Sequence, residues 1–213
     1  MPSERGGPDA VLFDMDGTLV DTEGLWWQAT ASVAASLGRS LGGADEPYVV
    51  GRTIEDVAAY LLAPDPLPQD APRLTKVVRQ LTDAFADRIE HGLTVVPGAP
   101  ELLAGLAATA IPTALVSASP RSIVELVLPR LGHAFDLVIA NEDTARGKPY
   151  PDPYLEAARR LGAAPSRCVA VEDSPAGIAA ATAAGCRVLV ASPEGLPSLP
   201  HIRAHGNLPS YGG

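Results

Sequence analysis

A chain of 213 residues, 46% of them hydrophobic, can bury a sizeable core as one domain or as one domain with an insertion. The formal net charge of −9 argues against a broad basic surface for nucleic acid or anionic membranes, although a local phosphate pocket remains compatible with it. The N-terminus lacks a signal-peptide pattern, and no apolar run approaches the roughly 18 residues of a membrane helix. Cys168 and Cys186 lack the spacing of a zinc or redox motif. We therefore expect a soluble cytoplasmic protein with buried thiols.

Five apolar runs of strand length alternate with helical stretches rich in alanine and leucine. They lie at residues 11–13, 113–116, 137–140, 168–171 and 187–190. This alternation predicts an α/β fold with a doubly wound parallel sheet. Because ligands bind such sheets beyond the carboxyl ends of the strands, we expect the polar residues that follow these runs to meet in space.

The alternation of strands and helices stops after the first strand. Residues 25–37, 53–62 and 74–89 read as amphipathic helices without intervening strands, which predicts an inserted α-helical cap over residues 21–97. Its hinges are expected at residues 21–23 and 95–98. Four prolines within residues 64–72 predict a loop inside the cap. Residues 1–20 and 98–213 then form the core, in which residues 192–213 are expected to be irregular.

The most informative segment is DMDGTLVDTE at residues 14–23, directly after the first apolar run. Because extended backbone sends alternate side chains to the same side, Asp14 and Asp16 would point into one cavity. Gly17 permits a sharp turn that keeps backbone amides near a bound anion, and Thr18 adds a hydroxyl. A solvated turn is the competing interpretation, but the preceding strand and the rest of the decapeptide favour a site for metal and phosphate.

This segment resembles the first motif, DxDGTL, of the haloacid dehalogenase superfamily of phosphotransferases, which residues 14–19 match without a gap. The resemblance implies that Asp14 is a covalent nucleophile and that Asp16 is the general acid and base. It also implies a doubly wound core with a helical cap.

Three later segments resemble the remaining motifs of the family, in the same order. Ser117 and Ala118 would bind a phosphoryl oxygen, and a helix cap or turn is the competing interpretation. Lys148, in RGKPYPDPYL, would neutralise the phosphate rather than serve as a solvated surface lysine. Glu172 and Asp173, in EDSPAG, would bind the metal, Asp173 directly and Glu172 directly or through water. Acidic residues at a helix N-terminus are the structural alternative for this pair.

The resemblance implies a magnesium-dependent phosphatase that acts on a small phosphorylated metabolite, such as a sugar phosphate, through an aspartyl phosphate. Mg²⁺ prefers oxygen ligands, and the carboxylates of Asp14 and Asp173 with the Asp16 carbonyl suit it. Arg52, in VVGRTIEDV, is the cap residue expected to contact substrate, although a plain surface arginine fits the pattern equally well. We expect a monomer without nucleic-acid or membrane partners.

Several other functions use related residues. A phosphomutase resembling beta-phosphoglucomutase is the nearest alternative, but its family often has a phosphate-binding lysine where this chain has Pro120 and Arg121. A haloacid dehalogenase does not need Asp16, and a phosphonate hydrolase needs a cap lysine, for which Lys76 lacks supporting context. A phospho-accepting signalling receiver normally lacks an inserted cap, and a noncatalytic binding protein has no need to retain every reactive group.

Overall fold

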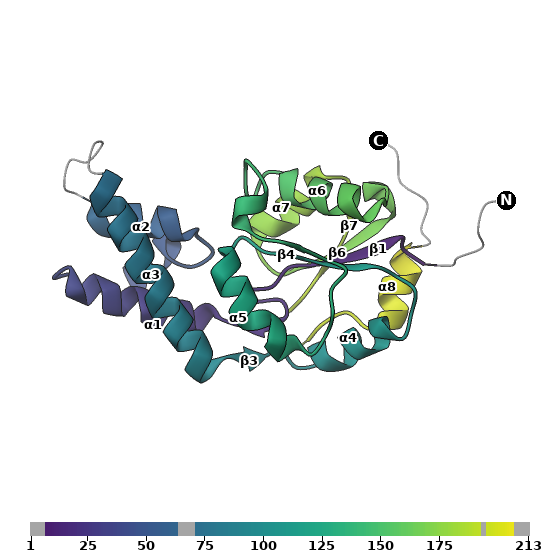
Figure 1. Cartoon of the computed structure of the whole chain (residues 1–213), viewed down its shortest axis with the longest axis horizontal. Coiled ribbons are helices and arrows are strands. Elements are labelled where there is room, and N and C mark those ends of the chain that lie inside the picture. The colour runs from purple at the N-terminus through teal and green to yellow at the C-terminus, as the bar shows by residue number, and fades with distance from the viewer. Residues whose placement is uncertain (1–6, 64–70, 193–194, 207–213) are drawn as a thin grey trace.

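The computed structural model describes residues 7–63, 71–192 and 195–206. Its centre is a five-stranded parallel sheet with the strand order β5-β4-β1-β6-β7 (Figure 1). The strands are β1 (Ala10–Phe13), β4 (Thr113–Val116), β5 (Leu137–Ile139), β6 (Cys168–Glu172) and β7 (Arg187–Val190). All five predicted strands are confirmed to within one residue, and the fold is the predicted doubly wound α/β type.

Two layers of helices cover the two faces of the sheet (Figure 1). On one face lie α6 (Asp152–Leu161) and α7 (Pro175–Ala183). On the other face lie α4 (Ala99–Ala107), α5 (Arg121–Leu131) and α8 (Leu199–Gly206). Because both faces are covered, β1, β4 and β6 are buried along their whole length, which explains their continuous apolar sequences.

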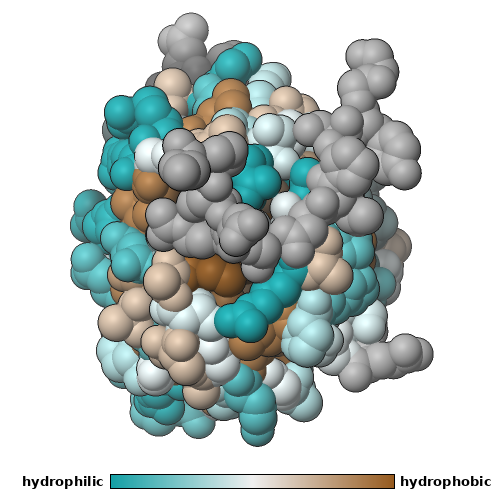
Figure 2. Space-filling model, turned by 90° about the vertical axis from the view of Figure 1, so that its right-hand side faces the viewer, coloured by the Kyte–Doolittle hydropathy of each residue, from teal (hydrophilic) through white to brown (hydrophobic). Residues whose placement is uncertain are grey.

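A separate group of helices lies at one end of the sheet. It consists of α1 (Glu23–Ser36), α2 (Ile54–Leu62) and α3 (Ala71–Gly92), and both α1 and α2 pack against α3. β1 starts on the side of the termini and runs toward this helical group (Figure 1). The other four strands are parallel to β1, so all carboxyl ends of the sheet lie toward the helical group. Figure 2 shows the opposite end of the core, where hydrophilic and hydrophobic residues are interspersed.

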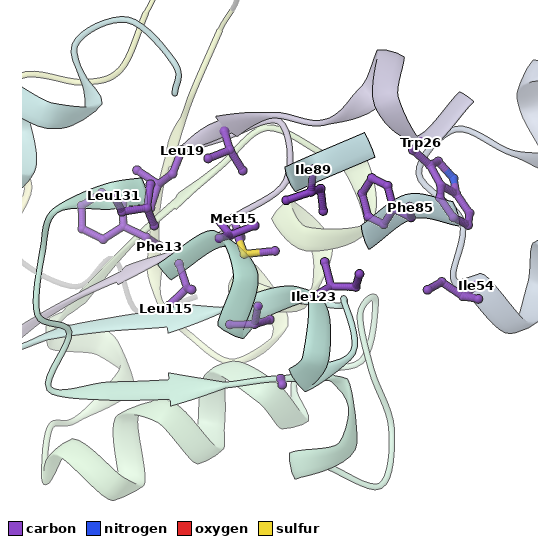
Figure 3. Close-up of a cluster of buried hydrophobic side chains, with 14 of the residues drawn as sticks. Phe13, Met15, Leu19, Trp26, Ile54, Phe85, Ile89, Leu115, Ile123 and Leu131 are labelled. Atoms are coloured by element: carbon purple, nitrogen blue, oxygen red, sulfur yellow. The ribbon is translucent and has the colours of Figure 1, made fainter. Parts of the chain in front are cut away.

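One hydrophobic cluster extends from the sheet into the helical group. Figure 3 shows Phe13 and Leu115 of the core together with Trp26 and Phe85 of the helices, all buried in this cluster. The rings of Trp26 and Phe85 meet edge to face with their centroids 5.2 Å apart. Leu12, at the alternate position of β1, instead packs in the cluster that contains residues of α6 and α7. Apolar packing thus holds the helical group against one layer of the core.

The three predicted helices of the insertion are confirmed, and no strand lies between them in the part of the chain that the structure describes, but a short ribbon that was not predicted flanks the insertion. β2 (Val20–Asp21) and β3 (Thr94–Val95) form a two-stranded antiparallel ribbon where the chain leaves and re-enters the core. A 3-10 helix, η1 (Gly43–Tyr48), also precedes α2. Strands of two residues carry no periodic pattern, and their pairing joins segments far apart in the sequence, so no local pattern predicts them.

The C-terminal region departs from the predicted irregular structure because residues 199–206 form α8, whose Ile202 is fully buried. Of the predicted proline-rich loop, residues 64–70 lie outside the described residues, and residues 71–72 already belong to α3. Two further 3-10 helices are η2 (Asn141–Asp143) and η3 (Pro165–Arg167). Within the described ranges, no helix combines the length and apolar character needed to cross a membrane.

Candidate active site

The segments that follow β1, β4, β5 and β6 meet at the carboxyl end of the sheet. Lys148 Nζ lies 2.5 Å from Asp14 Oδ1 and 2.5 Å from Glu172 Oε1. The Ser117 hydroxyl donates to Asp16 Oδ2 over 3.3 Å. All four sequence motifs therefore contribute side chains to one cluster at this end of the sheet, which consists of a hydrogen-bonded set around Lys148 and another around Asp16.

Lys148 is the cation at the centre of this cluster. Its side chain is buried, as are those of Asp14 and Glu172. A buried ion is costly unless it is paired, and here the ammonium contacts two carboxylates. Burial alone would lower the pKa of Lys148, but Asp14, Tyr154 and Glu172 raise that pKa well above its ordinary value. The lysine therefore keeps its positive charge at neutral pH.

Glu172, at the end of β6, is fully buried and has hydrogen-bond donors at both carboxylate oxygens. Oε1 accepts from Lys148 Nζ and from the Tyr154 hydroxyl, the latter over 2.7 Å. Oε2 accepts from the backbone amides of Asp173 and Ser174 and from the Ser174 hydroxyl, at 3.1, 3.2 and 3.1 Å. The protein thus holds this carboxylate in one orientation.

Asp16 lies in a different environment, surrounded by hydroxyl groups. Thr22 donates to Oδ1 over 2.9 Å, and Ser119 and Ser117 donate to Oδ2 over 2.8 and 3.3 Å. Burial raises the pKa of Asp16 above its ordinary value, although these three hydrogen bonds act in the opposite direction. A carboxyl group with a raised pKa is better suited to exchanging a proton near neutral pH than an exposed aspartate.

Gly17 and Thr18 support Asp173, which follows β6. The Thr18 hydroxyl donates to Asp173 Oδ1 over 2.9 Å. Gly17 has a φ of +84°, and a Cβ atom there would lie 2.2 Å from Asp173 Oδ2. The Gly17 amide donates to the Val20 carbonyl, so this N–H is engaged within the loop rather than directed at a substrate. Glycine is therefore required both by the backbone and by the close approach of the carboxylate.

Asp14, Glu172 and Asp173 offer carboxylate oxygens that lie within 4.8 Å of one another, a spacing that could hold a metal ion. Asp14 Oδ2 is buried and has no hydrogen-bond partner among the described residues. Burial and the neighbouring Glu172 carboxylate raise the pKa of Asp14 well above its ordinary value. Oxygen-only ligands suit a hard divalent cation, which would both satisfy this oxygen and relieve the repulsion between the carboxylates.

Comparison with known proteins agrees with this geometry. The family model of haloacid dehalogenase-like hydrolases matches residues 8–185. The chain belongs to this family. The matched region contains β1, the helical group and all four motifs of the site.

Among the relatives of this hydrolase, hexitol phosphatase B from Escherichia coli (strain K12) is 35% identical over 189 residues, which cover 87% of this chain and 84% of that protein. A bifunctional riboflavin kinase/FMN phosphatase from Arabidopsis thaliana is 31% identical over 193 residues, or 89% of this chain, but this chain spans only 48% of that longer protein. The crystal structure of a mutant CbbY from Rhodobacter sphaeroides in complex with xylulose-(1,5)bisphosphate has a TM-score of 0.77 and 29% identity, with 86% of each chain covered. Family membership and the phosphatases among its relatives identify this protein as a phosphoric monoester hydrolase.

Two predicted substrate-binding residues lie at the edge of the cluster or away from it. Ala118 is partly buried in the loop between Ser117 and Ser119. Arg52 is exposed on the loop before α2, where its Nε donates to the Pro47 carbonyl over 3.1 Å. Among the described residues, no recorded hydrogen bond or ion pair connects Arg52 to the cluster.

Sequence reasoning missed three side chains of the site. Ser119 is not among the predicted site residues, but its hydroxyl donates to Asp16, while Pro120 is the N-cap of α5. Thr22 lies in the decapeptide at residues 14–23, so its hydroxyl could have been considered with the first motif. Tyr154 lies in the RGKPYPDPYL segment that contains Lys148, but its contact with Glu172 depends on how α6 packs against the sheet and could not be predicted.

Proposed function

We propose that this hydrolase is a magnesium-dependent phosphatase that cleaves a small phosphorylated metabolite through an aspartyl phosphate on Asp14. The observation that carries the proposal is the arrangement around Asp14. One carboxylate oxygen contacts the buried Lys148, and the other is buried without a hydrogen-bond partner among the described residues. A buried carboxylate oxygen without a hydrogen-bond partner can bind a cation, and the adjacent ammonium of Lys148 can bind a phosphoryl group.

Asp14 is the nucleophile in this proposal. Its carboxylate forms a bond to phosphorus while the bond from phosphorus to the ester oxygen breaks, and the product is a phosphoryl group on Asp14. Lys148 and the Ser117 hydroxyl would stabilise the charge that spreads over the equatorial oxygens. The central place of Lys148 in the cluster supports this role.

Asp16 serves both half-reactions. Its carboxyl group gives a proton to the departing alkoxide and then takes a proton from the water that hydrolyses the aspartyl phosphate. The hydrogen bonds from Thr22, Ser117 and Ser119 would hold the side chain in place during both steps. Its raised pKa supports the assignment, because the acidic form must be populated when the ester bond breaks.

Asp14 Oδ2, Asp173 and the Asp16 carbonyl would hold the Mg²⁺ ion. When bound, this ion would neutralise the repulsion between the nucleophile and the phosphate. Both oxygens of Glu172 already accept hydrogen bonds from the protein, which supports contact with the ion through water rather than directly. Gly17 and Thr18 would act by fixing Asp173.

The helical group is proposed to be a cap, with residues 21–97 as the cap and residues 1–20 and 98–213 as the catalytic core. The β2–β3 ribbon lies where these two parts join, near both predicted hinges. The group lies toward the carboxyl ends of the strands, where it could close over a substrate and exclude water (Figure 1). Arg52 is the proposed substrate contact from the cap.

A sugar phosphate is the proposed substrate class. Hexitol phosphatase B and the CbbY complex with xylulose-(1,5)bisphosphate both point to phosphorylated polyols or sugars. The motifs of the core contact only the phosphoryl group, so the cap would distinguish among such substrates.

A substrate screen tests the function. Purified protein is incubated with sugar phosphates, phosphoglycolate and nucleotides, in Mg²⁺ and in EDTA, and released phosphate is measured. We expect Mg²⁺-dependent release that Asp14→Asn lowers by on the order of 10⁶-fold, as loss of a nucleophile does in other enzymes. The circular dichroism spectrum should stay unchanged. Near-normal activity of Asp14→Asn would refute the nucleophile, and conversion of a sugar phosphate to its isomer in place of phosphate release would refute hydrolysis.

A further inference from the structure

Tyr154 is a fully buried phenol on α6 that contacts two members of the site. Its hydroxyl donates to Glu172 Oε1 over 2.7 Å. Its ring lies against the ammonium of Lys148, with 5.3 Å between Nζ and the ring centroid. A single side chain thus contacts both the carboxylate and the cation that is bound to it.

The hydroxyl of Tyr154 acts only as a donor toward Glu172. A neutral donor satisfies an oxygen of a buried carboxylate without adding charge. The Tyr154 hydroxyl thus satisfies Glu172 Oε1 together with Lys148.

The backbone of α7 also restricts the Glu172 carboxylate. A Cβ atom at Gly177 of α7 would lie 1.7 Å from Glu172 Oε1, so the carboxylate lies directly against the backbone of that helix. The carboxylate is held between α7, the Ser174 cap and Tyr154. Of these contacts, the Tyr154 hydroxyl is the one that shares Oε1 with Lys148.

We propose that Tyr154 is a positioning residue that fixes Glu172 and Lys148 relative to Asp14. The inference rests on the proposed function, because it concerns the same site. Without the hydroxyl, Lys148 is the remaining donor to Oε1 among the described residues, and the ammonium is drawn toward Glu172 and away from Asp14. Both the orientation of the nucleophile and the spacing of the three carboxylates then change.

Tyr154→Phe is a clean test because it keeps the buried ring and its contact with Lys148 and removes only the hydroxyl. Tyr150→Phe is the matched control, because it removes the same hydroxyl group at a half-exposed position. The ring of Tyr150, which the substitution keeps, contacts Arg146. For each protein, calorimetric titration with Mg²⁺ alone gives the dissociation constant. Phosphate release from the best substrate of the screen, measured over a range of Mg²⁺, gives kcat and KM.

We expect Tyr154→Phe to weaken Mg²⁺ binding or to lower kcat by about tenfold, as loss of a residue that orients a metal ligand typically does. Its circular dichroism spectrum should match that of the unaltered protein, and Tyr150→Phe should change neither quantity by more than about twofold. If Tyr154→Phe keeps both the Mg²⁺ dissociation constant and kcat within the range of the control, the positioning role is refuted. Failure of the unaltered protein to release phosphate would instead refute the proposed function.

Discussion

The core end of the site and the helical group that faces it are built differently. In the core, charged side chains are buried and paired, as in the contacts of Lys148 with Asp14 and Glu172. In the helical group, the polar and aromatic residues before α2 lie at the surface. Tyr48 is 54% exposed while its ring stacks on that of Tyr60, with centroids 4.7 Å apart.

From this difference we infer that the core carries out the reaction while the helical group selects the substrate. Buried, paired groups cannot move without losing their partners, so they keep a fixed geometry for the reaction. Exposed groups such as Arg52 can change partners at little cost. Substitutions in the core should therefore lower kcat, whereas substitutions in the helical group should change KM.

The largest effect on this comparison is expected from Lys148→Met. The substitution removes the cation that contacts Asp14, and we expect kcat to fall by on the order of 10²- to 10³-fold, which is typical when a group that stabilises transition-state charge is lost. Lys76→Met is the control, because Lys76 is the other lysine of the chain and is exposed on α3. Steady-state phosphate release measures both variants, and equal kcat values would contradict the assigned role of Lys148.

Lowering the pH should weaken Mg²⁺ binding. Burial raises the pKa of both Asp14 and Asp173 above the ordinary value of 3.8, so these groups take up protons at a higher pH than exposed aspartates do. Protons then compete with the cation, and affinity should fall by up to about tenfold per pH unit for each titrating carboxyl group. Calorimetry at neutral and mildly acidic pH measures this fall. An affinity that does not depend on pH would contradict carboxylate ligands of this kind.

Gly17→Ala should separate a steric effect at the site from backbone strain. Its Cβ atom would collide with the Asp173 carboxylate, and we expect kcat to fall by about tenfold as that side chain is displaced. Gly38→Ala is the control, because Gly38 also has a positive φ, +76°, but no atom within 4 Å of the added Cβ. Both variants should lose about 1 kcal/mol of unfolding free energy through backbone strain. Similar kcat values for the two would argue against the importance of the Asp173 position.

The smallest effect is expected from Arg52→Ala in the helical group. If Arg52 contacts the substrate, KM should rise about twofold to fivefold, the range typical of an exposed charge interaction, while kcat stays constant. Arg79→Ala, at an exposed position of α3, is the control. A fall in kcat without a change in KM would place Arg52 in the chemistry and would break the proposed separation between core and cap.

Much of the fold could be predicted because the central strands are continuous apolar runs with helical patterns between them. The pairing of β2 with β3 could not, since it joins two-residue segments across the whole helical insertion. The helix α8 was also missed, because its short sequence contains Pro200 and Gly206 and is held largely by the burial of Ile202.

The site divides in the same way. Residues within contiguous motifs, such as Asp14, Lys148 and Asp173, could be named from the sequence. The hydroxyl of Ser119 and the phenol of Tyr154 could not be assigned, because their partners lie after β1 and at the end of β6, and these contacts are fixed only by tertiary packing. Motifs thus identify the reactive groups, and packing decides which neighbours orient them.

Mass spectrometry of the protein during turnover tests the central claim most directly. The hydrolase is mixed with its best substrate and Mg²⁺, quenched rapidly in acid and digested, and the peptide that contains Asp14 is analysed. We predict that this peptide carries one added phosphoryl group on Asp14 and that the modification is absent from Asp14→Asn. Rapid release of phosphate without a phosphoryl group on Asp14, or with the group on another residue, would contradict the account.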